Sequence, residues 1–263
     1  MKNPEAAIIT LSDWLATPAG CYIHAWERAC LDLLTADIFG FHAVQIGLPQ
    51  LPALAASRMT HRWQTDQHAS SLADTRLERP VVLLHDFEEL PFATQSLDLV
   101  VMPHVLEFAA HPHQVLREVE RVLIPEGQVI ISGFNPASLW GLRQSLHRLG
   151  ASGYLPSQCG LISLPRLKDW MQLLNMALDD HFHGVYALPF SSYRWLNRCE
   201  FLERAGARWW PFLGAVYVVR AIKRVRGMTL IGPAWRKSAA QLAPGLPVTN
   251  KGQESQSNIL QTE

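Results

Sequence analysis

The middle of the chain alternates short apolar runs with one amphipathic helical segment. The runs are Val81–Leu84, Leu97–Met102 and Val129–Ser132, each bounded by turn residues. Their continuous apolar character is typical of strands buried on both faces. From Pro112 the pattern changes to a helical period, and the apolar residues on one face are Val115, Leu116, Val119, Val122 and Leu123. The order strand, helix, strand predicts a parallel crossover in an α/β sheet.

The flanking segments extend this sheet. Pro112 suits a first helical turn, and Pro125-Glu126-Gly127 provides a stop signal. Hydrophobic spacing also predicts further elements. In chain order they are a helix from Gly20 to Phe39-Gly40, a strand at His42–Ile46, a helix at Leu51–Arg58, a strand at Met59–Trp63, a short helix at Ser138–Arg143, a helix at Arg166–Met176, a strand at Ala177–Leu188, a helix over 193–204 and an antiparallel last strand at Trp209–Arg220.

Polar residues follow three of these strands. Gly47 ends the strand at His42–Ile46, His85-Asp86-Phe87 follows Val81–Leu84, and Pro103-His104 follows Leu97–Met102. In open α/β sheets, ligands bind beyond the carboxyl ends of the strands. We therefore expect a binding site at this edge, with Gly47 and Asp86 shaping a single hollow.

Several motifs in order and spacing carry a resemblance to a known family. They are Asp86, Leu90-Pro91-Phe92, Ser96–Val100, His104–Glu107, Arg121–Gly127 and Phe134-Asn135-Pro136. The stretch 81–136 resembles class I S-adenosylmethionine-dependent methyltransferases, most closely the type 11, small-molecule branch. The resemblance implies a Rossmann-like α/β fold, with seven mostly parallel strands, an antiparallel last strand and helices on both faces. It also implies S-adenosyl-L-methionine as the cofactor and methyl transfer to a small or lipid-like acceptor.

The resemblance also implies site residues. Asp86 would accept from the adenine amino group, the Phe87 amide would meet the ring, and Gln45, Gly47 and His104 would line the rest of the cofactor site. The family has an acidic residue and a GxGxG loop where this chain reads Gln45-Ile46-Gly47-Leu48-Pro49. Asp66, the nearest acid to the second strand, is a weaker candidate for the ribose. No fixed catalytic residue is implied; His104 and Tyr22 are candidates for contact with the acceptor, and His85 is a further one.

Composition limits the remaining choices. With 263 residues, 48% of them hydrophobic, the chain can form one substantial core. We expect a methyltransferase domain over 1–237 and a disordered tail over 238–263, which is polar and patternless. The four cysteines form no CxxC pair and no secretory leader is evident, so we expect a cytoplasmic protein. The longest apolar run, Trp209–Val219, is too short to span a bilayer.

The distribution of charge along the chain is compatible with more than one kind of binding partner. Between Arg194 and Lys237 there are ten basic and two acidic residues, so this segment carries +8 and the remainder −8. Aromatic residues interleave with these arginines, which suits nucleic acid or an anionic lipid surface. We disfavour nucleic acid because no recognised binding motif accompanies the charge. His181 and His183 form an HxH pair without further ligands, so we expect no metal site. The oligomeric state is not determined.

Two other functions compete with methyl transfer. The eroded glycine loop suits a methyltransferase-like domain that has lost activity and serves as a binding or regulatory module. A nicotinamide-dependent dehydrogenase is disfavoured because the chain lacks GxGxxG as well.

Overall fold

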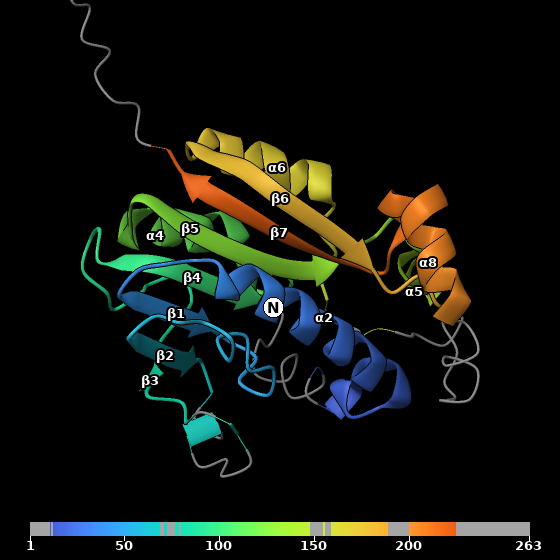
Figure 1. Ribbon diagram of the computed structural model, residues 1–263, viewed down its shortest axis with the longest axis horizontal. Coiled ribbons are helices and arrows are strands. Elements are labelled where there is room, and N and C mark those ends of the chain that lie inside the picture. Colours follow the sequence, from blue (N-terminus) through green and yellow to red (C-terminus); the bar gives the residue numbers. More distant parts are fainter. Residues whose placement is uncertain are drawn as a thin grey trace, which may run out of the picture. The chain divides into compact units, whose positions relative to one another are not determined.

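A computed structural model describes residues 11, 13–68, 71–72, 77–78, 80–147, 155, 159–188 and 200–224. Seven strands form one sheet in the order β3-β2-β1-β4-β5-β7-β6 (Figure 1). The strands are β1 (His42–Ile46), β2 (His61–Asp66), β3 (Leu83–Leu84), β4 (Leu97–Pro103), β5 (Leu123–Phe134), β6 (Met176–Gly184) and β7 (Val216–Lys223). β1 to β5 are parallel, and β7 pairs antiparallel with β5 and β6. The predicted Rossmann-like sheet with an antiparallel last strand is confirmed.

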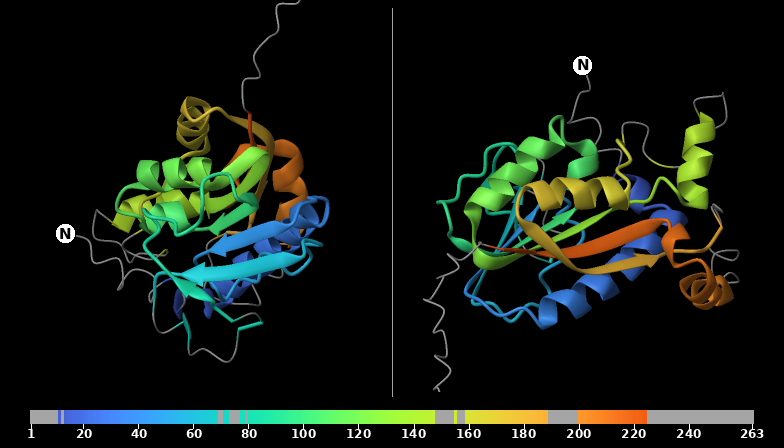
Figure 2. Two further views of the ribbon diagram at one scale, coloured as in Figure 1. Left: turned by 90° about the vertical axis from the view of Figure 1, so that its left-hand side faces the viewer. Right: turned by 90° about the horizontal axis from the view of Figure 1, so that it is seen from above.

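Helices cover both faces of the sheet (Figure 2). They are α2 (Pro18–Ala36), α3 (Val105–Phe108), α4 (Pro112–Val122), α5 (Leu139–His147), α6 (Leu164–Leu173) and α8 (Glu200–Trp209), with a 3-10 turn, η2 (Pro211–Leu213). Alternate residues of the central strands enter two separate cores: Val101 packs in the core that contains α2 residues, and Val100 in the one that contains α4 and α6 residues. This two-sided burial explains why the central strands read as continuous apolar runs.

The predicted helix after Pro112 is confirmed as α4, whose apolar face is fully buried. Its polar face contributes Arg121, which donates hydrogen bonds to the carbonyls of Leu90 and Phe92 and to Glu118. Glu118 accepts in turn from the Leu90 N–H. These contacts join two of the sequence motifs, because one ion pair satisfies the backbone of the Leu90-Pro91-Phe92 segment.

Asp98 has the structural role expected of a residue at the start of a strand. Its carboxylate accepts from the backbone N–H groups of Phe41 and His42. A Cβ on Gly40 would lie 2.5 Å from the Asp98 Cβ, so only glycine fits where the chain enters β1. Asp98 therefore fixes the register between the start of β1 and the start of β4.

One predicted helix is absent, and two predicted strands begin later than expected. The segment Leu51–Arg58 contains no helix and runs as turns and loop, because Pro52 removes an N–H and the buried Gln45 side chain binds this backbone instead. Trp209–Trp210 end α8 and lead into η2, so the last strand begins only at Val216. The start of β2 also lies later than predicted, which places Asp66 at the strand's last position.

Candidate functional site

The carboxyl edge of the sheet brings the predicted site residues to neighbouring strand ends. From the outer strand β3 inward, Asp86 follows β3, Asp66 ends β2, Gly47 follows β1, His104 follows β4 and Asn135 follows β5. Gly47 and His104, which are 57 positions apart in sequence, are thus neighbours, because the adjacent parallel strands β1 and β4 end at the same edge of the sheet. The structure therefore places these residues at the edge of the sheet that the sequence predicted.

Gln45 does not face this edge. Its side chain is buried, and its Nε2 donates to the carbonyls of Gly47, Leu48 and Leu51 at 3.3, 3.1 and 2.7 Å. Its Oε1 accepts from the Ala53 N–H at 2.9 Å. The loop backbone thus engages the Nε2 hydrogens and one lone pair of Oε1, and the contact of Gln45 with a cofactor stays a prediction.

The expected single hollow between Gly47 and Asp86 is divided by Phe87. Gly47 has a φ of 70°, and a Cβ there would lie 3.3 Å from the Phe87 ring and 2.9 Å from a Val105 methyl carbon. The cavity beside Gly47 and His104 has a volume of only ≈ 10 Å³, and Leu11 closes it. This inner cavity has no room for the methionine part of the cofactor.

The outer part of the site is open. A pocket of ≈ 220 Å³ is lined by residues that follow β2 and β3 and by the α3–α4 turn: Gln67, Asp86, Phe87, Glu88, Phe108, Ala109, Ala110 and His111. Asp86 is exposed, and one of its oxygens accepts from the Glu88 N–H at 3.0 Å, which leaves lone pairs available on the carboxylate. A flat ring with an N–H donor fits this pocket, as the sequence suggested for adenine.

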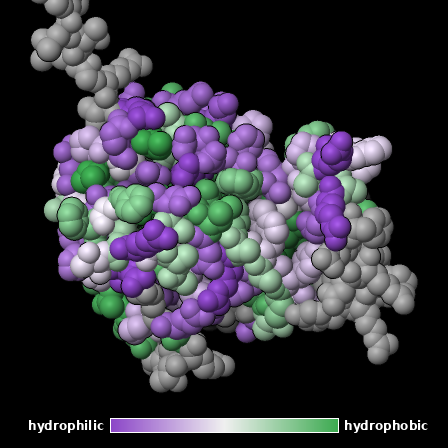
Figure 3. All heavy atoms as spheres, in the orientation of Figure 1, coloured by the Kyte–Doolittle hydropathy of each residue, from purple (hydrophilic) through white to green (hydrophobic). Residues whose placement is uncertain are grey.

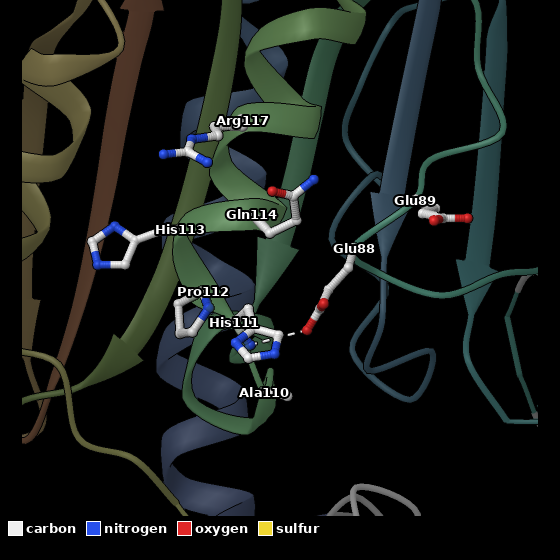
Figure 4. Close-up of a pocket in the computed structure, with 8 residues that line it drawn as sticks. All are labelled: Glu88, Glu89, Ala110, His111, Pro112, His113, Gln114 and Arg117. Carbon is white, nitrogen blue, oxygen red and sulfur yellow. Dashed lines mark hydrogen bonds between the residues drawn. The ribbon is translucent and has the colours of Figure 1, made fainter.

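A wider groove of ≈ 560 Å³ continues from this pocket along the start of α4 (Figure 4). Glu88 accepts from the His111 N–H at 2.9 Å, and this hydrogen bond lies on the boundary that the two spaces share. Arg117 and Glu89 line the groove farther out. The open surface of the site is therefore polar and carries both charges.

Asp66, which the sequence suggested only as a weaker candidate, lies closer to the site than its position in the predicted strand implied. It is buried at the end of β2, where its carboxylate accepts from the Gln67 N–H at 2.8 Å and from the Ser71 hydroxyl. Both oxygens are thus engaged, and Asp66 shapes the loop beside the pocket.

His104 is enclosed between two carboxylates. Its Nε2 lies 2.9 Å from a Glu27 oxygen, and its Nδ1 lies 2.8 Å from a Glu107 oxygen. All three side chains are buried, and His104 has a left-handed φ of 54°. Burial alone would lower the pKa of His104, but the two carboxylates outweigh it and raise the pKa to about 10. Burial also raises the pKa of Glu107.

This triad changes the prediction for His104. The imidazole faces the closed inner cavity and has no exposed edge, so in this conformation it contacts neither cofactor nor acceptor. Glu107 is not a surface residue, because it also accepts from the Phe134 N–H and from the Cys159 thiol. The triad instead connects α2, α3 and the end of β5 behind the cavity.

Tyr22 and His85 are also engaged elsewhere. The Tyr22 hydroxyl donates to Glu203 of α8 at 2.9 Å, so it joins two helices and does not lie over the cavity. The His85 ring lies 3.0 Å from the Thr65 hydroxyl and 2.8 Å from the Asp86 carbonyl. The candidacy of both residues for acceptor contact is not supported by this geometry.

Sequence reasoning missed Glu27 and Leu11. Glu27 occupies the same helical face as Ile23 and Leu31, both fully buried, so an acid at an apolar position was the available signal. Leu11 lies in an N-terminal helical turn that folds over Gly47, and no periodicity in the sequence indicates that contact.

The comparisons with known proteins agree with this geometry. Residues 49–131 match the family model described as a methyltransferase domain. A chain in the complex of the Haloferax volcanii Trm112 methyltransferase activator with a methyltransferase has the same fold, with a TM-score of 0.57 at 18% identity over 84% of this chain and 99% of that one. The chain belongs to the class I S-adenosylmethionine-dependent methyltransferases.

A relative over most of its length is the uncharacterised protein YafS of Escherichia coli, 33% identical over 82% of each chain. Two other relatives match shorter stretches. The malonyl-[acyl-carrier protein] O-methyltransferase of Halorhodospira halophila is 35% identical over 28% of this chain and 25% of its own length. The ubiquinone/menaquinone biosynthesis C-methyltransferase of Nitrosospira multiformis is 36% identical over 31% and 32%.

The residues present fit one part of the cofactor in this conformation. The pocket at Asp86 and Phe87 offers a carboxylate and an aromatic side chain that match an adenosyl group, whereas the inner cavity at Gly47, which Leu11 and Phe108 line, measures only ≈ 10 Å³. Among the described residues, no helix is both long and apolar enough to cross a membrane.

Proposed function

We propose that this S-adenosylmethionine-dependent methyltransferase transfers its methyl group to a small or lipid-like acceptor. The observation that carries the proposal is the pocket between Asp86 and Phe87, because it supplies a carboxylate and an aromatic wall at the strand edge where such cofactors bind. The two relatives with named activities differ, one a malonyl-[acyl-carrier protein] O-methyltransferase and the other a C-methyltransferase of ubiquinone/menaquinone biosynthesis. The relative from ubiquinone/menaquinone biosynthesis supports a lipid-like acceptor.

We further propose roles for the site residues. Asp86 accepts the adenine amino group, Phe87 supports the ring, and the left-handed Gly47 allows the chain to turn beside the cofactor. S-adenosylmethionine supplies an electrophilic methyl group, so the protein has to align the acceptor and exclude water. His104, held between two acids, positions α2 and the end of β5 around the cavity.

Calorimetric titration of the full chain with S-adenosylhomocysteine tests this site. We expect Asp86→Asn to weaken binding about tenfold, because it replaces a charged acceptor by a neutral one, and a hydrogen bond to a charged group contributes about 1.5–3 kcal/mol against about 1 kcal/mol for a neutral pair. Glu89→Gln is the matched control, since Glu89 is a neighbouring exposed acid that lines only the outer groove. Equal affinity in Asp86→Asn and the wild type would contradict the proposed role.

A turnover assay separates the proposed function from an inactive binding module. The enzyme is incubated with cell extract and S-adenosylmethionine labelled in its methyl group. Label recovered in the organic phase supports a lipid-like acceptor, and label in small aqueous products supports a polar one. Label found only on protein, or binding without any transfer in extracts, would contradict the proposal.

We also propose a reducing, cytoplasmic compartment. The described cysteines Cys21, Cys30 and Cys159 carry free thiols, and burial raises the pKa of Cys30 to about 12, which keeps that thiol unreactive.

A further inference from the structure

An aromatic patch projects from the end of α8. It consists of Trp209, Trp210 and Phe212, whose exposed fractions are 69%, 50% and 61%. Exposed apolar residues scattered singly are normal, but three large aromatic side chains within four consecutive residues form a continuous surface. This exposure requires an explanation, because the patch contributes little to either core.

The backbone beneath the aromatic patch is held in place. Asn135, which follows β5, donates from Nδ2 to the carbonyls of Phe212 and Gly214 at 2.8 and 2.9 Å. The Tyr186 hydroxyl donates to the Pro211 carbonyl at 2.7 Å. The aromatic side chains are therefore presented by an anchored turn and not by a frayed helix end.

The charge around the aromatic patch is positive. Arg204 and Arg208 lie one helical turn apart on α8, both exposed, and neither has an ion-pair partner in the described part of the chain. By contrast, Arg220, Lys223 and Arg224 are each paired with a carboxylate. Three of the ten basic residues counted between Arg194 and Lys237 are thus neutralised, and among those that the structure describes Arg204 and Arg208 are the ones without an ion pair.

Glu203, one of the two acids of α8, is turned away from these arginines. Glu203 points inward, where it accepts from the N–H groups of residues 185–187 and from the Tyr22 hydroxyl. These hydrogen bonds hold the turn after β6 in place, and they keep the Glu203 carboxylate pointing away from the surface. Figure 3 shows hydrophilic residues along the outer side of the α8 region.

The aromatic patch lies at the carboxyl edge of the sheet. In Figure 1, the arrow of β5 points toward α8 and α5, and Asn135 links the two regions directly. α5 also presents two exposed leucines, Leu139 and Leu142, at this end. A partner bound to the aromatic patch would therefore lie at the same edge of the sheet as the proposed site for the acceptor.

We propose that the aromatic patch, with Arg204 and Arg208, docks the enzyme on an anionic lipid bilayer. Indole rings favour the membrane interface because one end is apolar and the other donates a hydrogen bond. Arginines beside them attract anionic headgroups. A protein partner would explain the apolar surface equally well, but it would leave the unpaired arginine pair without a role. Docking of the aromatic patch on a membrane does not depend on the proposed roles of the cofactor-site residues.

Vesicle cosedimentation with the full chain tests docking. We expect the protein to bind vesicles of phosphatidylglycerol and phosphatidylcholine, and to bind pure phosphatidylcholine at least tenfold more weakly. Each reversal Arg204→Glu or Arg208→Glu should reduce affinity for the anionic vesicles about fivefold or more. The double substitution Trp209→Ala with Trp210→Ala should reduce it about tenfold or more.

Matched controls come from other parts of the chain. Arg58→Glu with Lys168→Glu changes the same charge at exposed positions, and Phe39→Ala with Phe41→Ala removes aromatic residues that are 77% and 68% exposed. Both control variants should bind vesicles as the wild type does. Circular dichroism melting of each variant separates lost docking from lost folding.

Three results would overturn the proposal. The first is equal binding to neutral and anionic vesicles, or none to either. The second is a self-associated wild type that the patch variants convert to monomer in analytical ultracentrifugation, with vesicle binding unaffected. The third is retention of an RNA oligonucleotide that the patch variants lose while vesicle binding is unchanged. A failed Asp86→Asn titration would leave the docking result intact, so the two proposals fail separately.

Discussion

At the scale of single residues, the most consequential feature is the burial of His104 between Glu27 and Glu107. Two carboxylates and one imidazole lie out of contact with water, so the triad depends on the proton that the imidazole carries. Removing one member of such a group leaves the others as uncompensated buried charges. The triad should therefore affect stability more than any surface ion pair of the chain.

The triad predicts a pH dependence of stability. Because the folded protein raises the pKa of His104 from 6.5 to about 10, it holds this proton more tightly than the unfolded chain does. The raised pKa of Glu107 acts in the same direction. The stabilisation is fully present below about pH 6.5 and is lost as pH rises toward about 10, by up to about 1.4 kcal/mol per pH unit.

Urea unfolding of wild type and His104→Gln between about pH 7 and about pH 9 checks this. His104→Gln should lower the free energy of unfolding by about 3 kcal/mol near neutral pH and flatten its pH slope. His181→Gln, at an exposed position, should change neither. A wild-type stability that is flat over this range would show that the triad carries no extra proton.

Gln45 yields a second prediction at this scale. Restoring the acid that the family has at this position, by Gln45→Glu, should lower the free energy of unfolding by about 3 kcal/mol, because a carboxylate would then face three carbonyls. It should not strengthen S-adenosylhomocysteine binding. Differential scanning calorimetry and calorimetric titration measure the two effects, with the exposed Gln114→Glu as the control. Tighter binding by Gln45→Glu would mean that the loop rearranges around the cofactor.

At the scale of elements, the loop after β1, which contains Gly47, and the N-terminal turn, which contains Leu11, together limit the size of the inner cavity. The loop after β1 has lost the helix expected there and is fixed by Gln45, while Leu11 covers Gly47 from the other side. We therefore expect the methionine part of the cofactor to enter only after the Leu11 turn moves. The apparent affinity would then fall by the fraction of molecules in which the turn has moved.

Leu11→Ala tests this coupling. Removing the side chain should lower stability by about 2–3 kcal/mol and at the same time raise affinity for S-adenosylhomocysteine about fivefold, because less has to be displaced. Leu15→Ala removes a similar buried side chain that does not line the cavity, so it should lower stability alone. Calorimetric titration and urea unfolding supply both values. Weaker binding by Leu11→Ala would show instead that Leu11 closes over the bound cofactor and holds it.

At the scale of the whole molecule, the chain separates into one compact unit over Met1–Val225 and a second over Arg226–Glu263. Every described residue of the two main cores lies at or before Ala221. We therefore expect a chain that ends at Val225 to unfold within about 2 °C of the full chain, since it keeps every described residue of the two cores. A drop of more than about 5 °C in calorimetry would show that the second unit supports the first.

The sequence by itself determined the central strands, α4 and the edge at which the site lies, because these depend on local hydrophobic period and on chain order. Asp98 and the Leu90-Pro91-Phe92 segment were likewise recognisable, since their partners are backbone groups at fixed places in the fold. Only the tertiary structure decided that Phe87 divides the hollow, that Leu11 closes it and that Glu27 meets His104. Such contacts join residues distant along the chain, and their geometry depends on how α2 and the N-terminal turn pack on the sheet, which no local pattern encodes.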